Sequence, residues 1–352
     1  MGVGIRNWLF DVGLLSSKKY DLPIISVGNI TVGGTGKTPH TEYLLKLLSP
    51  IMKVAMLSRG YKRTTRGFIL ADESSDCDSI GDEPFQILQK YKENVVVAVD
   101  GNRCRGIENL LASDYGPELG AIVLDDAFQH RFVQPGISIL LTDYNRLITS
   151  DRLLPIGNLR EPASNRKRAN IVIVTKCPET AQPIDYRLVT KTLSLYPYQN
   201  LYFSKYVYKE LIPVFASDKT KRITKELILK EKYELLVFSG IVSQQHLIDY
   251  LHQYTSHLQA IEYPDHHFYT EDDLLAIENK FKSIERAKKI IITTEKDAAR
   301  LVGNRFFPES VKEFIYMLPI EVTFLFDQEK LFNEQILGYV SKNKTNRSLF
   351  RK

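Results

Sequence analysis

The chain has 352 residues, 43% of them hydrophobic and 25% charged, which is the composition of a globular protein with room for two domains. The sequence contains no run of about 18 apolar residues, so no transmembrane helix is expected. Arg6, Asn7 and Asp11 interrupt the N-terminal apolar stretch, which argues against a cleavable signal peptide. Three widely spaced cysteines indicate neither a disulfide framework nor a zinc site. The net charge of +5 suits an anionic ligand or membrane surface. The sequence lacks a dense stripe of basic residues interleaved with aromatic residues, so no nucleic-acid partner is expected.

The first element in chain order is an apolar segment within residues 1–20. Trp8, Leu9 and Phe10 lie in a stretch that can form one helical face, with Arg6 and then Lys18 nearby. An interfacial helix, with the tryptophan at the level of lipid headgroups, is one interpretation. A terminal helix packed on the core is the other, and the pattern alone favours it.

Short apolar runs rich in β-branched residues follow, and they read as buried parallel strands separated by helices or loops. They cover residues 23–27, 54–57, 95–99, 121–124, 137–141 and 171–174. Two further strands are expected at 235–238 and 290–293, with a helix near 244–254 between them. This alternation predicts α/β architecture with helices on both faces of a sheet.

The stretch 202–232 is more charged and has an irregular period, so we place the domain boundary there. The resulting division is an N-terminal segment 1–20, a P-loop domain 21–200, a linker 201–233 and a smaller C-terminal α/β domain 234–352. The polar, basic tail 341–352 is expected to fray.

The clearest motif follows the first predicted strand and matches a P-loop in its order of strand, glycines, lysine, threonine and helix. Such a loop closes backbone N–H groups around phosphate, its lysine reaches the β- and γ-phosphates, and the next hydroxyl binds Mg²⁺. The candidate nucleotide-binding residues are Thr31, Val32, Gly33, Gly34, Thr35, Gly36, Lys37 and Thr38. Thr31 stands where the usual pattern has its first glycine.

An acidic pair, Asp125 and Asp126, follows the strand predicted at 121–124. Two carboxylates at the end of a buried strand are typical of a Walker B site for Mg²⁺. Such a pair is also common in turns and helix caps, and the presence of a P-loop favours the metal site.

Several further blocks, taken with these two, resemble the tetraacyldisaccharide 4′-kinase family of lipid A biosynthesis, and they run in family order over nearly the whole chain. They are 28–39, Ser58-Arg59-Gly60-Tyr61, Gly81-Asp82-Glu83-Pro84, 125–130, Arg152-Leu153-Leu154-Pro155, 157–162, Pro264-Asp265-His266 and 293–297. Members of this family typically carry Ser or Thr at the position of Thr31. Ala127 departs from the usual glycine, and the N-terminal apolar segment is shorter than in many members.

The resemblance implies two α/β/α sandwich domains of P-loop type joined by a small β linker. It implies ATP and Mg²⁺ as co-substrates and an acylated disaccharide 1-phosphate as the lipid acceptor, which becomes lipid IVA. It further implies a peripheral enzyme, attached through its N-terminal amphipathic segment to the cytoplasmic face of the bacterial inner membrane. We expect a monomer.

The resemblance also assigns roles to residues that look unremarkable by themselves. Asp126 and Glu161 would bind the metal with Thr38, and Asp82 with His266 would form the dyad that deprotonates the acceptor hydroxyl. From the sequence alone, Asp82 reads as a helix cap and His266 as a loop histidine.

A second group would orient the metal shell, the acceptor or a phosphate. Asp125, Gln129 and His130 belong to it, and Arg103 is either a phosphate ligand or a solvated surface residue. Lys296 and Asp297 are interpreted as a structural ion pair. Two other functions stay open: a membrane-associated P-loop switch and a P-loop kinase of a soluble metabolite.

Overall fold

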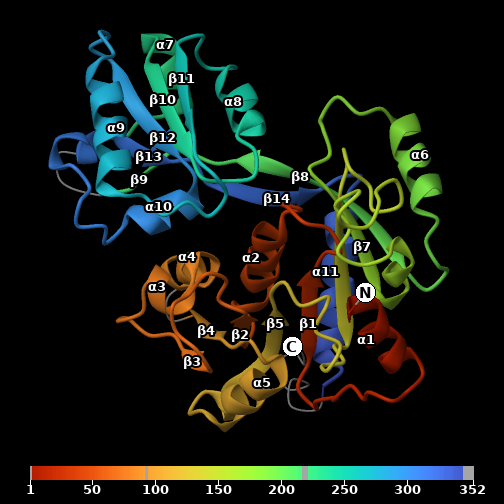
Figure 1. Ribbon diagram of the computed structural model, residues 1–352. Helices are drawn as coiled ribbons and strands as arrows, with labels where there is room; N and C mark the ends of the chain where they lie inside the picture. Colours follow the sequence, from red (N-terminus) through yellow and green to blue (C-terminus); the bar gives the residue numbers. More distant parts are fainter. Residues whose placement is uncertain (1, 92–93, 216–220, 344–352) are drawn as a thin grey trace. The chain divides into compact units, whose positions relative to one another are not determined.

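The computed structural model describes residues 2–91, 94–215 and 221–343 and divides the chain into two compact units (Figure 1). The first unit comprises Met1–Val207 and Val322–Lys352, and the second comprises Tyr208–Glu321. Each unit is built on its own sheet, of nine and five strands respectively.

The sheet of the first unit has the order β14-β8-β7-β6-β1-β5-β2-β4-β3. From β8 to β4 all neighbouring strands pair in parallel, and β3 is antiparallel to β4 at one edge. The strands are β1 (Ile24–Gly28), β2 (Lys53–Ser58), β3 (Ile69–Leu70), β4 (Val95–Val99), β5 (Leu119–Leu124), β6 (Ile137–Asp143), β7 (Ile171–Thr175), β8 (Asn200–Tyr208) and β14 (Ile320–Phe324).

Helices cover both faces of this sheet, because successive side chains of a strand point to opposite faces. On one face, strand residues such as Val27 pack with α2, α4 and α11. On the other face, residues such as Val172 pack with α6, and residues such as Leu124 pack with α5. The helices of this unit are α1 (Gly2–Asp11), α2 (Lys37–Leu48), α3 (Cys77–Ile80), α4 (Asp82–Tyr91), α5 (Arg103–Ala112), α6 (Pro183–Leu193) and α11 (Gln328–Ser341).

The second unit repeats this arrangement on a smaller scale, with strand order β11-β10-β12-β13-β9. Leu235 and Ile292 lie on one face with α7 and α8, while Phe238 and Ile291 lie on the other face with α9 and α10. Its elements are β9 (Ile212–Pro213), α7 (Lys225–Glu231), β10 (Glu234–Ser239), α8 (Gln245–Leu251), β11 (Leu258–Glu262), α9 (Glu271–Lys282), β12 (Lys289–Thr293), α10 (Glu295–Leu301) and β13 (Ile315–Met317). The α/β architecture expected from the sequence is confirmed.

The chain passes between the units along β8 and β14, which are neighbours in the nine-stranded sheet. The last described helix, α11, therefore belongs to the first unit, where Phe332, Ile336 and Val340 lie in the core with β1 and α2. This differs from the division drawn from the sequence, which placed 234–352 in one C-terminal domain. Residues 344–352 of the expected frayed tail lie outside the described part of the chain.

Candidate active site

The P-loop connects β1 to α2 at the centre of the first sheet. β1 lies between β5 and β6, and open parallel sheets bind ligands beyond the carboxyl ends of their strands. Gly33 and Gly36 have φ values of 92° and 85°, which favour glycine. Gly36 precedes α2 without a side-chain cap, so no side chain there competes with a phosphate for the first N–H groups of the helix.

Arg160 and Asn29 hold the backbone of this loop. The Arg160 guanidinium donates to the Thr31 carbonyl at 2.9 Å and to the Asn29 side-chain oxygen at 2.7 Å. Asn29 in turn donates through Nδ2 to the Thr35 hydroxyl at 2.7 Å. The loop shape is therefore fixed by side chains as well as by its glycines.

Asp126 faces this loop from the turn after β5. Its carboxylate oxygens lie 3.8 Å from Lys37 Nζ and 3.8 Å from an Arg160 Nη1 atom. The Oδ1 atom is buried and accepts no hydrogen bond from the described residues. An oxygen in this position is suited to a cation, because a buried acceptor without a partner is costly.

Asp125 points the other way, into the protein. It accepts a hydrogen bond from the Thr41 hydroxyl of α2 at 2.9 Å. Burial, and then the neighbouring Asp126 and Glu83 carboxylates, raise the pKa of Asp125 to about 6. Its contact with α2 makes it a link between the Walker B turn and the helix that follows the P-loop.

Arg103 is a buried residue, with 2% of its surface exposed. Its guanidinium donates to the backbone carbonyls of Asp100 at 2.6 Å and Asp125 at 3.0 Å. Burial lowers the pKa of Arg103 to about 10. The interpretation as a solvated surface arginine is therefore wrong, and its observed contacts support the Walker B turn.

Gln129 and His130 follow the acidic pair. The Gln129 side chain donates to the backbone carbonyl of Asn29 at 2.7 Å, at the start of the P-loop. Burial, followed by the charges of Arg103 and Arg59, lowers the pKa of His130 to about 4. The imidazole is thus neutral at pH 7 and can accept a hydrogen bond from an acceptor hydroxyl.

Glu161 is fully buried. Arg168 and Asn165 both contact its Oε2 atom, the latter at 2.8 Å. Its Oε1 atom accepts no hydrogen bond from the described residues and lies 3.9 Å from a terminal nitrogen of Arg6. Glu161 thus offers one oxygen to a cation while the other is held by the protein.

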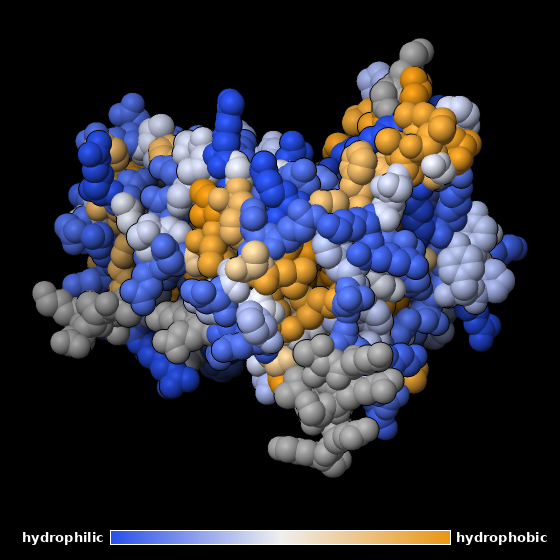
Figure 2. Space-filling model, turned by 90° about the horizontal axis from the view of Figure 1, so that it is seen from below, coloured by the Kyte–Doolittle hydropathy of each residue, from blue (hydrophilic) through white to orange (hydrophobic). Residues whose placement is uncertain are grey.

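The N-terminal helix α1 has two distinct sides. Asp11 pairs with Arg131 at 2.7 Å, and the Phe10 ring packs against Phe132, so one side is attached to the first unit. Ile5 and Trp8 are 60% and 58% exposed on the other side. Figure 2 shows hydrophobic surface on the right, where Figure 1 places α1. Neither α1 nor any other helix in the described ranges has the length and hydrophobicity needed to cross a membrane.

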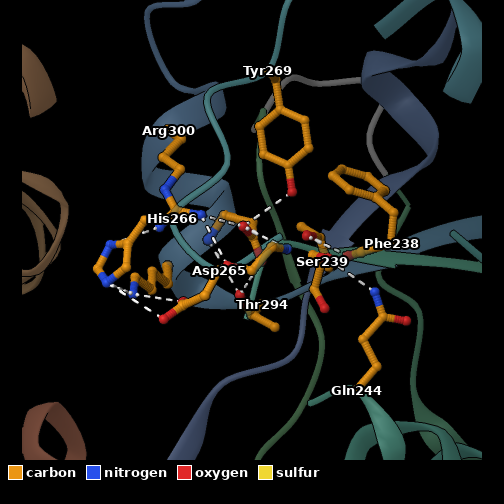
Figure 3. A network of polar contacts seen from close by, with 12 residues as sticks. Phe238, Ser239, Gln244, Asp265, His266, Tyr269, Thr294 and Arg300 are labelled. Carbon is orange, nitrogen blue, oxygen red and sulfur yellow. Dashed lines mark hydrogen bonds and ion pairs between the residues drawn. The ribbon is translucent and has the colours of Figure 1, made fainter. Parts of the chain in front are cut away.

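The two residues of the expected dyad lie in different units. Asp82 is the half-buried first residue of α4 in the first unit, after Gly81 with φ of 91°. His266 lies in the second unit in a left-handed conformation, with φ of 58°. Its ring nitrogens face Lys296 and Arg300. Figure 3 shows His266 beside Arg300. The pairing of Asp82 with His266 stays a prediction.

A family model described as tetraacyldisaccharide-1-P 4′-kinase matches residues 1–341. The chain belongs to this family. It is similar to the tetraacyldisaccharide 4′-kinase of Phocaeicola vulgatus, with 51% identity over 345 residues that cover 98% of this chain and 93% of that protein. The corresponding protein of Bacteroides fragilis is 50% identical over 348 residues, which cover 99% and 92% of the two chains.

A solved structure is also similar: the "apo" form of LpxK from Aquifex aeolicus in complex with ATP. The TM-score is 0.70 and the identity 28%, with 96% of this chain and 94% of that chain covered. The family resemblance and the P-loop α/β fold drawn from the sequence are both confirmed.

Arg160 and His40 are two site residues that the sequence analysis did not assign. Arg160 belongs to a family block, so its neighbour Glu161 could have drawn attention to it. His40 lies in α2 behind the loop, and nothing in its sequence context distinguishes it from a core histidine. Both act through backbone carbonyls, which leave no pattern in the sequence.

Proposed function

We propose that this chain transfers the γ-phosphate of ATP to the 4′-hydroxyl of a tetraacyldisaccharide 1-phosphate, forming lipid IVA, with the nucleotide phosphates held at the N-terminus of α2. Membership of the family gives the reaction, which is ATP-dependent 4′-phosphorylation in lipid A biosynthesis. The observation that carries the residue assignment is the convergence of Lys37 and Arg160 on Asp126 beyond the ends of β1 and β5.

Phosphoryl transfer depends mainly on positioning and on neutralising charge. The loop from Thr31 to Thr38 would surround the phosphates with backbone N–H groups, and Lys37 would place its ammonium against the β- and γ-phosphates. Arg160 would keep the loop in shape through Thr31 and Asn29. The similar LpxK of Aquifex aeolicus was crystallised with ATP, which supports this nucleotide.

The residues present fit a magnesium ion. Asp126 and Glu161 each keep one buried carboxylate oxygen that accepts no hydrogen bond from the described part of the chain, and the Thr38 hydroxyl follows the P-loop lysine. Within the described ranges, no group of three or more His, Cys, Asp or Glu residues could hold a metal by itself. This agrees with Mg²⁺, which is commonly held by one or two carboxylates, water and substrate phosphates. Bound there, Mg²⁺ would neutralise charge on the transferred phosphoryl group.

The acceptor hydroxyl must lose a proton, and we assign this step to Asp82 and His266. Asp82 lies in the first turn of α4. An ionised carboxylate is the form that can accept a proton or orient an imidazole. His130, neutral at pH 7, is the residue of the first unit that we assign to orienting the acceptor.

The lipid acceptor would reach the enzyme from a membrane surface. The exposed apolar side of α1, with Ile5 and Trp8, supports peripheral attachment, and its polar side is held by ion pairs to the first unit. We place the enzyme on the cytoplasmic face of the bacterial inner membrane and as a monomer. The acylated disaccharide 1-phosphate carries both acyl chains for the membrane and an anionic group, which suits the net charge of +5.

The direct test incubates the purified chain with γ-labelled ATP, Mg²⁺ and a tetraacylated disaccharide 1-phosphate, and then separates the lipids by chromatography. One phosphate should be gained, at the 4′ position of the distal sugar, and Lys37→Ala should abolish the transfer. Steady ATP hydrolysis without labelled lipid would contradict the proposal and favour a nucleotide switch.

A further inference from the structure

A buried carboxylate, Asp297, organises the end of the sheet in the second unit. Its Oδ1 atom accepts hydrogen bonds from the Gly240 backbone at 3.1 Å, the Tyr269 hydroxyl at 3.0 Å and Arg300 at 2.7 Å. Its Oδ2 atom accepts from the Thr294 hydroxyl at 2.6 Å. With four donors, this carboxylate is fixed in one orientation and holds Arg300 in turn.

Arg300 extends this network to His266. Besides Asp297, its guanidinium contacts the Gly240 carbonyl at 3.3 Å and the Nδ1 atom of His266 at 3.5 Å. The backbone N–H of His266 donates to the same Gly240 carbonyl at 3.2 Å. The histidine is therefore held by its main chain and by its ring, and both contacts lead back to the Asp297–Arg300 pair.

The opposite edge of the ring faces a second pair of charges. Lys296 Nζ lies 3.1 Å from the Nε2 atom of His266, and a carboxylate oxygen of Asp265 lies 3.6 Å from it. Arginine and lysine can only donate hydrogen bonds, so each ring nitrogen of His266 faces a donor, and these contacts fix the place of the ring rather than the nitrogen that carries the proton.

We propose that Arg300, fixed by Asp297, is a positioning residue that sets the orientation of the His266 ring. The proposal rests on the assignment of His266 to the proton-transfer step. It gives the Asp297 of the 293–297 block a role beyond a structural ion pair, because its charge is transmitted to the ring through a guanidinium that contacts both. Tight packing around Gly240 supports the proposal. A Cβ added at Gly240 would lie 3.1 Å from the Pro264 carbonyl oxygen and 3.2 Å from an Arg300 terminal nitrogen, which leaves little room between these groups.

The test is a double-mutant cycle between Arg300→Met and His266→Ala, read as kcat, KM and melting temperature. Arg300→Met should lower kcat by roughly 10- to 100-fold, as a misplaced reacting group does, with little change in KM for ATP. In the His266→Ala background the same change should lower kcat less than about twofold, because residues that act as a unit are not additive. Arg286→Met is the matched control, since Arg286 contacts another histidine of this unit, His257, at 2.8 Å.

Arg300→Lys replaces Arg300→Met if that variant fails to fold, because an ammonium keeps a charge opposite Asp297 without the planar fork that reaches His266.

The outcomes separate this inference from the proposed function. If kcat losses of Arg300→Met and His266→Ala multiply, or if Arg300→Met keeps full activity while His266→Ala is impaired, the positioning role is overturned and the dyad survives. If His266→Ala itself is fully active, the assignment of His266 falls and this inference falls with it.

Discussion

The Nδ1 atom of His40 lies 2.7 Å from the carbonyl oxygen of Gly36, the residue at which the P-loop becomes α2. Its Nε2 atom lies 2.9 Å from the hydroxyl of Ser204 on β8. A carbonyl can only accept, so Nδ1 carries the proton and Nε2 accepts from the serine. One buried ring thus joins the end of the P-loop to a strand three places along the sheet.

This ring makes the fold sensitive to acid. Burial lowers the pKa of His40 to about 4, against an ordinary value of 6.5 in the unfolded chain. The contribution of the neutral His40 ring to the free energy of unfolding is complete above pH 6.5. As the pH falls towards 4, up to about 3 kcal/mol of this free energy is lost, because the unfolded chain takes up a proton that the folded protein does not. His40→Asn, whose amide can still donate to Gly36, should lose less free energy of unfolding over this interval, measured by urea denaturation at each pH.

The wild-type protein and the His40→Asn variant must be compared because burial also lowers the pKa of His130. His130 therefore also lowers the free energy of unfolding as the pH falls. The exposed His246 provides the control, and His246→Asn should follow the wild-type curve. Identical slopes for His40→Asn and wild type would show that His40 is not the acid-sensitive group.

Lys37→Ala should remove most phosphoryl transfer, by at least roughly 10²-fold in kcat, because the developing charge on the γ-phosphoryl group loses its direct cationic partner. The fold should survive, because the distance of 3.8 Å between Lys37 Nζ and the Asp126 carboxylate is too long for a hydrogen bond. Lys46→Ala, at an exposed position in the last turn of the same helix, should be unaffected. A folded Lys37→Ala variant with normal turnover would rule out P-loop chemistry.

Arg160→Met should weaken ATP binding by roughly 10- to 100-fold, because the Thr31 carbonyl and the Asn29 side chain lose a charged donor and the loop loses its shape. Calorimetric titration with ATP in the absence of Mg²⁺ measures this directly. Arg152→Met, at an exposed position of the segment between β6 and β7 that also contains Arg160, should bind ATP normally. Equal affinities of Arg160→Met and wild type would show that the glycines alone shape the loop.

Asp82→Ala and His266→Ala should each lower kcat by roughly 10²- to 10⁴-fold, the usual size of general-base catalysis. If the two residues act as one unit, the kcat of the double variant should be little lower than that of the less active single variant. ATP binding should remain nearly intact in all three, while Asp78→Ala and His246→Ala serve as exposed controls. Loss of ATP affinity in Asp82→Ala would reassign that carboxylate to the nucleotide or metal site.

Replacing Ile5 and Trp8 by serine should reduce binding to vesicles that contain anionic phospholipid, by about tenfold or more, because α1 loses its exposed apolar side. Sedimentation with vesicles measures the bound fraction. Leu331→Ser, which removes an equally exposed leucine from α11, should leave binding unchanged. Unaltered sedimentation of the Ile5/Trp8 variant would mean that α1 only packs on the first unit.

The central strands could be predicted from the sequence because they are buried on both faces and therefore read as continuous apolar runs. All eight predicted strands are present, as β1, β2, β4, β5, β6, β7, β10 and β12, and the predicted helix corresponds to α8. β8 was taken for part of a linker because it opens the stretch 202–232, which is more charged and has an irregular period, and because its second half, from Lys205, is only partly buried. The place of α11 could not be predicted, since sequence order suggests packing with its neighbours in the second unit.

The site was predictable where chemistry fixes the residue types, as in the P-loop and the acidic pair. The burial of Arg103 and Glu161 was not, because a charged residue normally reads as exposed unless its partners are known. Those partners are the backbone carbonyls of Asp100 and Asp125 in one case and Arg168 in the other, and only the fold brings them together.

The return of the chain through β14 has a consequence for biosynthesis. Phe332, Ile336 and Val340 complete a core that also contains Ile25 and Val27, at the opposite end of the sequence. A ribosome therefore releases the whole second unit before it delivers the residues that close the first. During that interval the apolar surface of the P-loop unit that α11 later covers is open to solvent or to a chaperone.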